Sequence, residues 1–292
     1  MTNKSASRLA ELHVHLEGTV SHQTATELAA SHGLPPPPPY EYSTLGEFLA
    51  IYRQVCRAMR SAADFERVIA EHAQSMAAQQ ITYAEISFNP SFHDGADWLA
   101  GVAAGRDRAR EEFGVEIAWL VELVRDGNVE SNERALEIAF ATAGVVGIGL
   151  VGDESASSAP VAPLVDRAHA KGLRFMPHAG QVRGADVVRD ALENLHADRI
   201  AHGVSAVGEP ALLQLLTERR VCLCICPTSN ARIGLRPNYR KLADAGVPLT
   251  VNSDDPAMVG TTLTQELERA ESILAIDRQQ LLANAEQFAF RT

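Results

Sequence analysis

Histidine and aspartate side chains occur at spacings that suit the binding of a metal ion. His13 and His15 are two residues apart, so on a strand both imidazoles point to the same side. His178, His202 and the pair Asp254–Asp255 each follow a short apolar run later in the chain. Three histidines and a carboxylate form an N3O ligand set with room for a water molecule. Such a site predicts chemistry in which a metal ion activates water.

Each of these residues also has an ordinary structural interpretation. A histidine pair on a strand can be half-buried packing, and Asp-Asp-Pro is common in turns and helix caps. The metal interpretation gains weight because all the pieces fall where predicted strands end. A site with two metal ions would need a bridging ligand such as a modified lysine near the fourth strand. Residues 144–154 contain no lysine, so the sequence favours a single ion.

Eight short apolar runs, separated mostly by stretches of helical pattern, must carry these side chains. Apolar residues recur at helical spacing in residues 161–171, 185–195 and 210–218. The predicted strands are residues 11–16, 82–88, 116–123, 146–151, 174–177, 199–201, 221–226 and 249–252.

Strand and helix alternating eight times predicts a (β/α)8 TIM barrel, a closed α/β fold whose active site lies at the carboxyl ends of the strands. An open doubly wound sheet is the alternative, but it usually has a glycine-rich phosphate loop after its first strand, and residues 13–18 are not one. We expect one domain over residues 1–292, with residues 1–9 as a flexible N-terminal tail.

Composition narrows the class of protein. Of the 292 residues 46% are hydrophobic, and the formal net charge is −11. The first value is too high for a disordered chain, and the second argues against a nucleic-acid partner. No apolar run has the length of a membrane helix and no secretory signal is recognisable, so we expect no membrane association and a cytoplasmic location. Cys222, Cys224 and Cys226 are either buried thiols or, less simply, a three-thiolate metal site.

Six motifs, in this order along the chain, resemble the adenosine deaminase family of the metal-dependent amidohydrolase superfamily. Each motif alone is weak, but the ordered set spans most of the chain. The motifs are residues 11–18 (ELHVHLEG), 149–154 (GLVGDE), 178–180 (HAG), 199–203 (RIAHG), 226–230 (CPTSN) and 252–256 (NSDDP).

The resemblance implies a deaminase that releases ammonia from a 6-aminopurine nucleoside or base. One Zn2+ per chain would be bound by the side chains His13, His15, His178 and Asp254. His202 would orient the attacking hydroxide and stabilise its charge, and Asp254 would help to take up the proton. Asp255 would bind purine N7, and the Gly152 N–H would bind N3. His15 and Glu17 would approach the sugar. Glutamate at position 17, where other members have aspartate, resembles members that act on adenine or on modified adenine nucleosides such as 6-amino-6-deoxyfutalosine.

Gln181 departs from the family pattern, in which His-Ala-Gly is followed by a glutamate that protonates purine N1. An amide can donate a hydrogen bond to N1 but cannot deliver a proton, and general acid catalysis contributes ~10²–10⁴-fold. Three interpretations stay open: an engineered change that traps a substrate, a natural loss of activity that leaves a silent purine-nucleoside binder, or a retuning toward another substrate. A cytidine-type zinc deaminase is excluded because the chain contains no C-x-x-C.

Overall fold

The computed structural model contains the eight predicted strands, and their predicted bounds agree with the observed ones to within two residues. The second, third and fourth strands are rich in β-branched and apolar residues and are almost completely buried, as expected for a parallel sheet covered by helices. The strands are β1 (Leu9–His15), β2 (Ile81–Phe88), β3 (Glu116–Val124), β4 (Val145–Val151), β5 (Arg174–Ala179), β6 (Arg199–His202), β7 (Cys222–Ile225) and β8 (Leu249–Val251).

All eight strands are parallel and pair in the order of the sequence, from β1 to β8. The ring is completed just after β8, where Asp254 forms a bridge with Val14 of β1. The Asp254 carbonyl accepts the His15 N–H at 2.8 Å, and the Asp254 N–H donates to the His13 carbonyl at 3.2 Å. The predicted (β/α)8 barrel is therefore confirmed.

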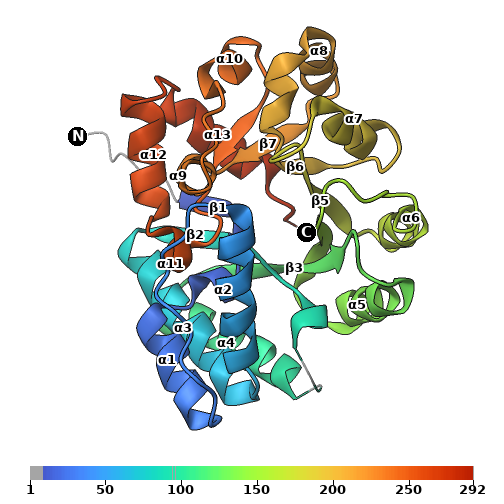
Figure 1. Ribbon diagram of the computed structural model, residues 1–292. Helices are drawn as coiled ribbons and strands as arrows, with labels where there is room; N and C mark the ends of the chain where they lie inside the picture. The colour runs from blue at the N-terminus through green and yellow to red at the C-terminus, as the bar shows by residue number, and fades with distance from the viewer. Residues whose placement is uncertain (1–8, 94, 96, 292) are drawn as a thin grey trace.

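Helices surround the barrel and cover its outer face (Figure 1). Several begin at a side-chain cap, such as Ser61 and Thr44, each of which forms a capping box with an acidic residue three positions later. The α-helices are α1 (His22–Ser31), α2 (Leu45–Ala58), α3 (Ala62–Ala78), α4 (Trp98–Phe113), α5 (Val129–Ala141), α6 (Ala162–Ala170), α7 (Ala185–Glu193), α8 (Pro210–Glu218), α9 (Pro227–Arg232), α10 (Tyr239–Asp244), α11 (Pro256–Val259), α12 (Leu263–Ser272) and α13 (Arg278–Phe288), with 3-10 turns η1 (Glu17–Thr19), η2 (Pro90–Phe92) and η3 (Val204–Gly208).

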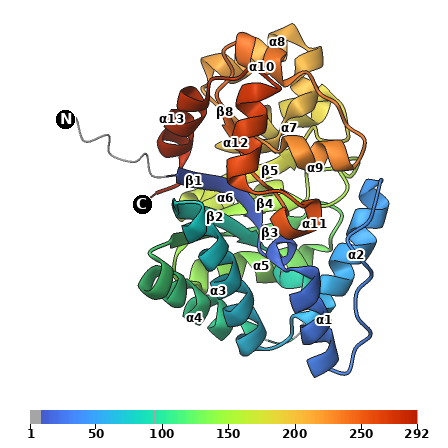
Figure 2. The same ribbon diagram turned by 90° about the vertical axis from the view of Figure 1, so that its left-hand side faces the viewer.

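The two ends of the barrel differ in their chemistry. The start of β1 and α13 lie at one end, whereas α2 and α11 lie at the other (Figure 2). Near the first end the buried Arg199 guanidinium pairs with Glu85 and lies 3.7 Å from the centre of the Phe290 ring. This filled end leaves the carboxyl ends of the strands as the place for a cavity.

The structure describes residues 9–291 except 94 and 96. The tail expected at residues 1–9 lies outside the described residues apart from Leu9, which begins β1. None of the helices in the described part has the length and apolar character that crossing a bilayer requires. The four cysteines are free and buried, as expected for apolar packing.

Candidate active site

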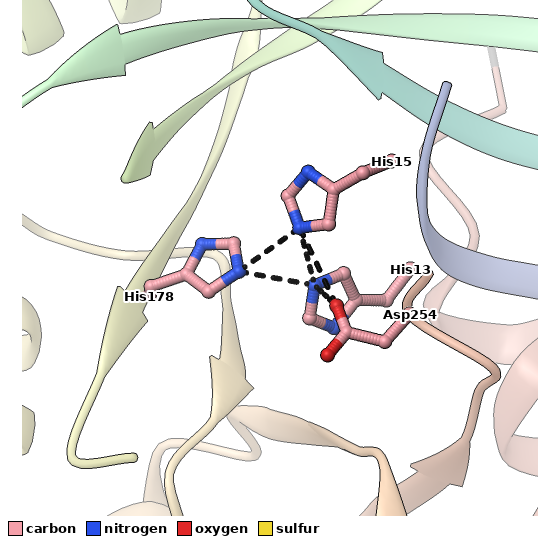
Figure 3. A group of neighbouring side chains, drawn as sticks. All are labelled: His13, His15, His178 and Asp254. Atoms are coloured by element: carbon pink, nitrogen blue, oxygen red, sulfur yellow. Dashed lines mark hydrogen bonds and ion pairs between the residues drawn. The ribbon is translucent and has the colours of Figure 1, made fainter. Parts of the chain in front are cut away.

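Four side chains meet at the carboxyl end of the barrel with their metal-binding atoms facing one another (Figure 3). The Nε2 atoms of His13, His15 and His178 lie 3.2–3.3 Å apart. Asp254 Oδ1 is 3.2 Å from His13 Nε2 and 3.4 Å from His15 Nε2. Atoms with this spacing share a centre about 2 Å from each, which is the length of a bond from zinc to nitrogen or oxygen. The group predicted from the motifs can therefore bind a metal ion.

Backbone irregularities aim these side chains. Between the pairs Glu11–Ala84 and Val14–Ile86, β1 has two residues where β2 has one, a β-bulge in the segment that carries His13. Asp254 has φ of +67°, a conformation uncommon for aspartate. Such conformations concentrate at functional sites, where the surrounding structure enforces them.

The outer nitrogens of two ligands have partners that orient the rings. His15 Nδ1 lies 2.9 Å from Ser87 Oγ, which in turn donates to the Val14 carbonyl at 3.3 Å. His13 Nδ1 lies 3.4 Å from Cys226 Sγ. With the hydrogen on Nδ1, each Nε2 keeps its lone pair for a metal ion.

The electrostatics of the group fit a cation. Burial lowers the pKa of His13 to about 3 and lowers the pKa of His178, so both rings stay neutral, as metal ligands must. Burial also opposes protonation of His15, but the Asp254 hydrogen bond and the carboxyls of Asp255 and Glu122 outweigh it and raise its pKa to about 10. The carboxyls crowded around His15 therefore attract positive charge, which a bound metal ion would supply.

His202 lies beside this group on the side of Asp254. It ends β6 with φ of +62°, and its Nε2 is 3.8 Å from Asp254 Oδ2. Ser229 donates to the same Oδ2 at 2.7 Å and fixes the carboxylate. One oxygen of Asp254 thus faces the three histidines, and the other faces His202 and Ser229.

Asp255 is buried and packs against the chain of η1. A Cβ atom added to Gly18 would overlap the Asp255 carboxyl, so only glycine leaves room for it. In the described part of the chain Asp255 Oδ1 has no hydrogen-bond partner, and burial together with Asp254 raises the pKa of Asp255 well above its usual range. The side chain can therefore donate a hydrogen bond as a neutral acid.

Gln181 lies at the cavity and belongs to a chain of side-chain hydrogen bonds. Its Nε2 donates to Asn230 Oδ1 at 3.0 Å, and Asn230 Nδ2 donates to the Tyr239 hydroxyl at 2.8 Å. The Gln181 backbone N–H donates to Glu154 at 2.9 Å, and Glu154 also accepts the N–H groups of Val182 and Arg183. The carboxylate of Glu154 therefore holds the loop that carries Gln181.

A cavity of about 500 Å3, within the range of pockets for drug-sized ligands, opens over these residues. His15, His178, His202, Gln181, Gly152 and Asp255 all line it. Gly152 has φ of +102°, which favours glycine, so backbone without a side chain forms this part of the wall. Aromatic side chains from α2 and the segment before it, such as Tyr42, Phe48 and Tyr52, form an apolar outer wall.

Glu17 lies behind the cavity wall and is absent from the lining residues in the described part. Its oxygens accept hydrogen bonds from His93 at 2.9 Å, the Tyr52 hydroxyl at 3.0 Å and the Asn89 N–H at 3.1 Å. The side chain is fully buried, which raises its pKa, but the hydrogen bonds from His93 and the Asn89 N–H outweigh burial and lower the pKa of Glu17. The contact between Glu17 and a sugar stays a prediction, while the geometry gives Glu17 a positioning role.

Sequence reasoning missed several polar residues at the site. Ser229, Asn230 and Glu154 lie inside the recognised motifs, but only the structure shows what they contact. Glu122 is a single acidic residue in the otherwise apolar second half of a strand, a signal that could have identified it. Burial raises its pKa to about 7, with His15 opposing.

Comparison with known sequences identifies relatives over nearly the whole chain. The model of the adenosine deaminase family matches residues 9–291. An aminodeoxyfutalosine deaminase from Streptomyces coelicolor is 36% identical, with 93% of this chain and 76% of the relative covered. An adenine deaminase from Rhodospirillum rubrum is 31% identical, with 93% of this chain and 87% of the relative covered.

Solved structures agree with these relatives. The crystal structure of an adenine deaminase from Arthrobacter aurescens superimposes with a TM-score of 0.91 at 27% identity, covering 98% of this chain and 95% of that one. An amidohydrolase from Burkholderia ambifaria with bound zinc has a TM-score of 0.87 at 25% identity, covering 97% and 86%. The chain therefore belongs to the adenosine deaminase family, and hydrolytic deamination of an adenine-type substrate is the reaction that its relatives and its site support.

Proposed function

We propose that this protein is a zinc-dependent deaminase of 6-aminopurine nucleosides and that Gln181 weakens its turnover. The observation that carries the proposal is the convergence of four metal-binding atoms with His202, Asp255 and Gln181 on one cavity. Zinc bound by His13, His15, His178 and Asp254 would lower the pKa of a coordinated water toward neutrality.

The side chains around this position would orient the water and the purine. His202 and Asp254 Oδ2 lie 3.8 Å apart and would accept and move the proton of the attacking water. Asp255 would donate to purine N7, and the Gly152 N–H would donate to N3. This orientation directs C6 and its amino group toward the three histidines, where the attack must occur.

Gln181 would lie next to purine N1 in this orientation. One hydrogen of its amide is used by Asn230, and the other is available to N1. The amide therefore supports binding and orientation of the purine. It supplies no proton to N1 as the ring accepts negative charge, which predicts slow deamination.

The size and lining of the cavity support a nucleoside larger than a bare purine. Tyr42, Phe48 and Tyr52 line the same cavity as His15 and add apolar surface to that of the residues that would contact the base. A relative from Streptomyces coelicolor is named for a modified adenine nucleoside, whereas the relative from Rhodospirillum rubrum is named for adenine. We favour the nucleoside because the cavity extends past the residues that would contact the base.

The test is ammonia release by zinc-loaded protein from adenosine, adenine and 6-amino-6-deoxyfutalosine. We expect turnover of at least one nucleoside, dependence on zinc, and loss of turnover with retained zinc in His202→Asn. Conversion of none of the three by protein with full zinc content would refute the catalytic proposal.

A second function, binding of a purine nucleoside without turnover, is favoured by the amide at position 181. Titration calorimetry on the same zinc-loaded protein distinguishes it from the first. Binding of adenosine without ammonia release would support the silent binder, and absence of both would refute the two together.

A further inference from the structure

Two buried polar groups that the proposed reaction does not use face the cavity at the ends of β2 and β3. Glu122 is 1% exposed, and in the described part of the chain neither of its carboxyl oxygens has a hydrogen-bond partner. Asn89 is also 1% exposed and lines the same cavity. Its Oδ1 accepts from Ser91, whereas its Nδ2 has no partner among the described residues. Buried polar groups without partners are rare and call for an explanation.

The barrel makes specific room for Glu122. Glu122 of β3 pairs with Gly149 of β4, and a Cβ atom added to Gly149 would overlap the Glu122 carboxyl. The carboxyl therefore lies across the neighbouring strand where a side chain would otherwise be. Its nearest oxygen is 3.9 Å from His15 Nδ1, which is already paired with Ser87 at 2.9 Å.

The cyclic order of the strands places these groups relative to a bound purine. In the proposed orientation N1 faces Gln181 after β5, N3 faces Gly152 after β4, and N7 faces Asp255 after β8. Around the purine, N9 lies between N3 and N7. Around the barrel, β3, β2 and β1 lie between β4 and β8. The substituent on N9 therefore points toward the strand ends that carry Glu122 and Asn89.

We infer that Glu122 and Asn89 form a ribose-recognition site, and this inference rests on the proposed function. A hydroxyl group can donate to a carboxyl and accept from an amide N–H at the same time. Glu122 offers the acceptor and Asn89 Nδ2 offers the donor, so the pair is complementary to a sugar hydroxyl. A free base has no hydroxyl to engage the pair, so the site selects nucleosides over adenine.

The test uses the isosteric variants Glu122→Gln and Asn89→Asp. The Asn89→Asp variant keeps the oxygen that accepts hydrogen bonds from Ser91. The substrates are adenosine, its 2′-, 3′- and 5′-deoxy analogues, and adenine, measured as kcat, KM and Kd. Loss of one hydrogen bond that leaves a buried polar partner unpaired predicts a rise of roughly 10- to 100-fold in KM and Kd for adenosine, with kcat little changed. In both variants the KM and Kd of adenine should change little, and so should those of the one deoxy analogue that lacks the recognised hydroxyl. Asp126→Asn is the matched control, because Asp126 also lines the cavity but already accepts the Asp153 N–H at 3.1 Å.

Two results would overturn the inference. An equal loss for adenosine and adenine would show that the pair does not recognise the sugar. A loss of bound zinc in Glu122→Gln would show that Glu122 acts by positioning His15. If the wild-type protein converts no 6-aminopurine, the proposed reaction fails, but the Kd values still test the ribose site: selective weakening for adenosine supports it, and unchanged Kd refutes it.

Discussion

Replacement of Gln181 by glutamate tests the chemistry of the site most directly. The change removes the Nε2 donor that lies 3.0 Å from Asn230 Oδ1 and brings a carboxyl oxygen against that acceptor. The conflict is relieved if the Asn230 amide turns over, because its Nδ2 then donates to the new carboxyl. The Tyr239 hydroxyl, now 2.8 Å from Asn230 Nδ2, can donate to the amide oxygen instead. The number of hydrogen bonds is conserved, so we expect the free energy of unfolding to change by no more than about 1 kcal/mol.

The gain in rate should be much larger than this change in stability. A positioned general acid contributes ~10²–10⁴-fold, which lowers the barrier by about 3–5 kcal/mol. We therefore expect kcat for Gln181→Glu to rise by that factor and to decline at high pH as the acid ionises. Steady-state ammonia release across pH measures this, and Gln181→Ala is the control that removes the amide without adding an acid. An unchanged or lower kcat, with wild-type zinc content and melting temperature, would refute our reasoning that a missing proton donor limits the reaction.

Three further perturbations test the metal group, the Asp255 pocket and a buried histidine. His13→Ala should reduce the zinc content, measured by elemental analysis, from about one ion per chain to none, and full occupancy in the variant would contradict the ligand set. Chelation of zinc from the wild type should lower its melting temperature, because a metal ion present at 1,000 times its Kd stabilises the folded state by about 4 kcal/mol. Gly18→Ala should displace the Asp255 carboxyl and weaken adenosine binding at least tenfold by calorimetry; unchanged affinity would remove Asp255 from purine recognition. Burial lowers the pKa of His72 from its ordinary 6.5 to about 4, so the unfolded chain binds a proton between these values while the folded chain does not. The contribution of neutral His72 is therefore fully present above pH 6.5 and is lost as the pH falls toward 4, by about 3 kcal/mol in total. Urea unfolding across pH should show a smaller slope in His72→Leu than in the wild type and the exposed control His196→Asn, while other buried histidines such as His13 and His202 keep their own contributions. An equal slope in all three proteins would refute the assignment.

The sequence predicted the barrel well because strand burial leaves a strong local signal. A run such as Ile148-Gly149-Leu150-Val151 can only be a buried strand or a helix, and its length and flanking glycines decide between them. The same logic located the ligand side chains, since each lies within or just after a predicted strand. The β-bulge near His13 was beyond reach, because it depends on how β1 and β2 pair. The place of Tyr52 was also beyond reach, because the sequence pattern of a helix does not reveal which cavity the helix will border.

Glu17 and Glu122 show the limit of transferring roles by motif. The motif places Glu17 just after β1, near the expected sugar, but its carboxylate already accepts hydrogen bonds from His93, Tyr52 and Asn89. Glu17 is fully buried and absent from the described cavity lining, so a sugar hydroxyl could reach it only if one of these partners moved away. A buried partner left unpaired in this way costs about 1–3 kcal/mol. Glu122 borders the cavity, and neither of its oxygens has a hydrogen-bond partner in the described part of the chain, so the hydroxyl of the inferred ribose site would displace no partner there. Position in a strand determines which end of the barrel a carboxyl reaches, whereas its neighbours determine whether it binds a ligand or holds the protein together.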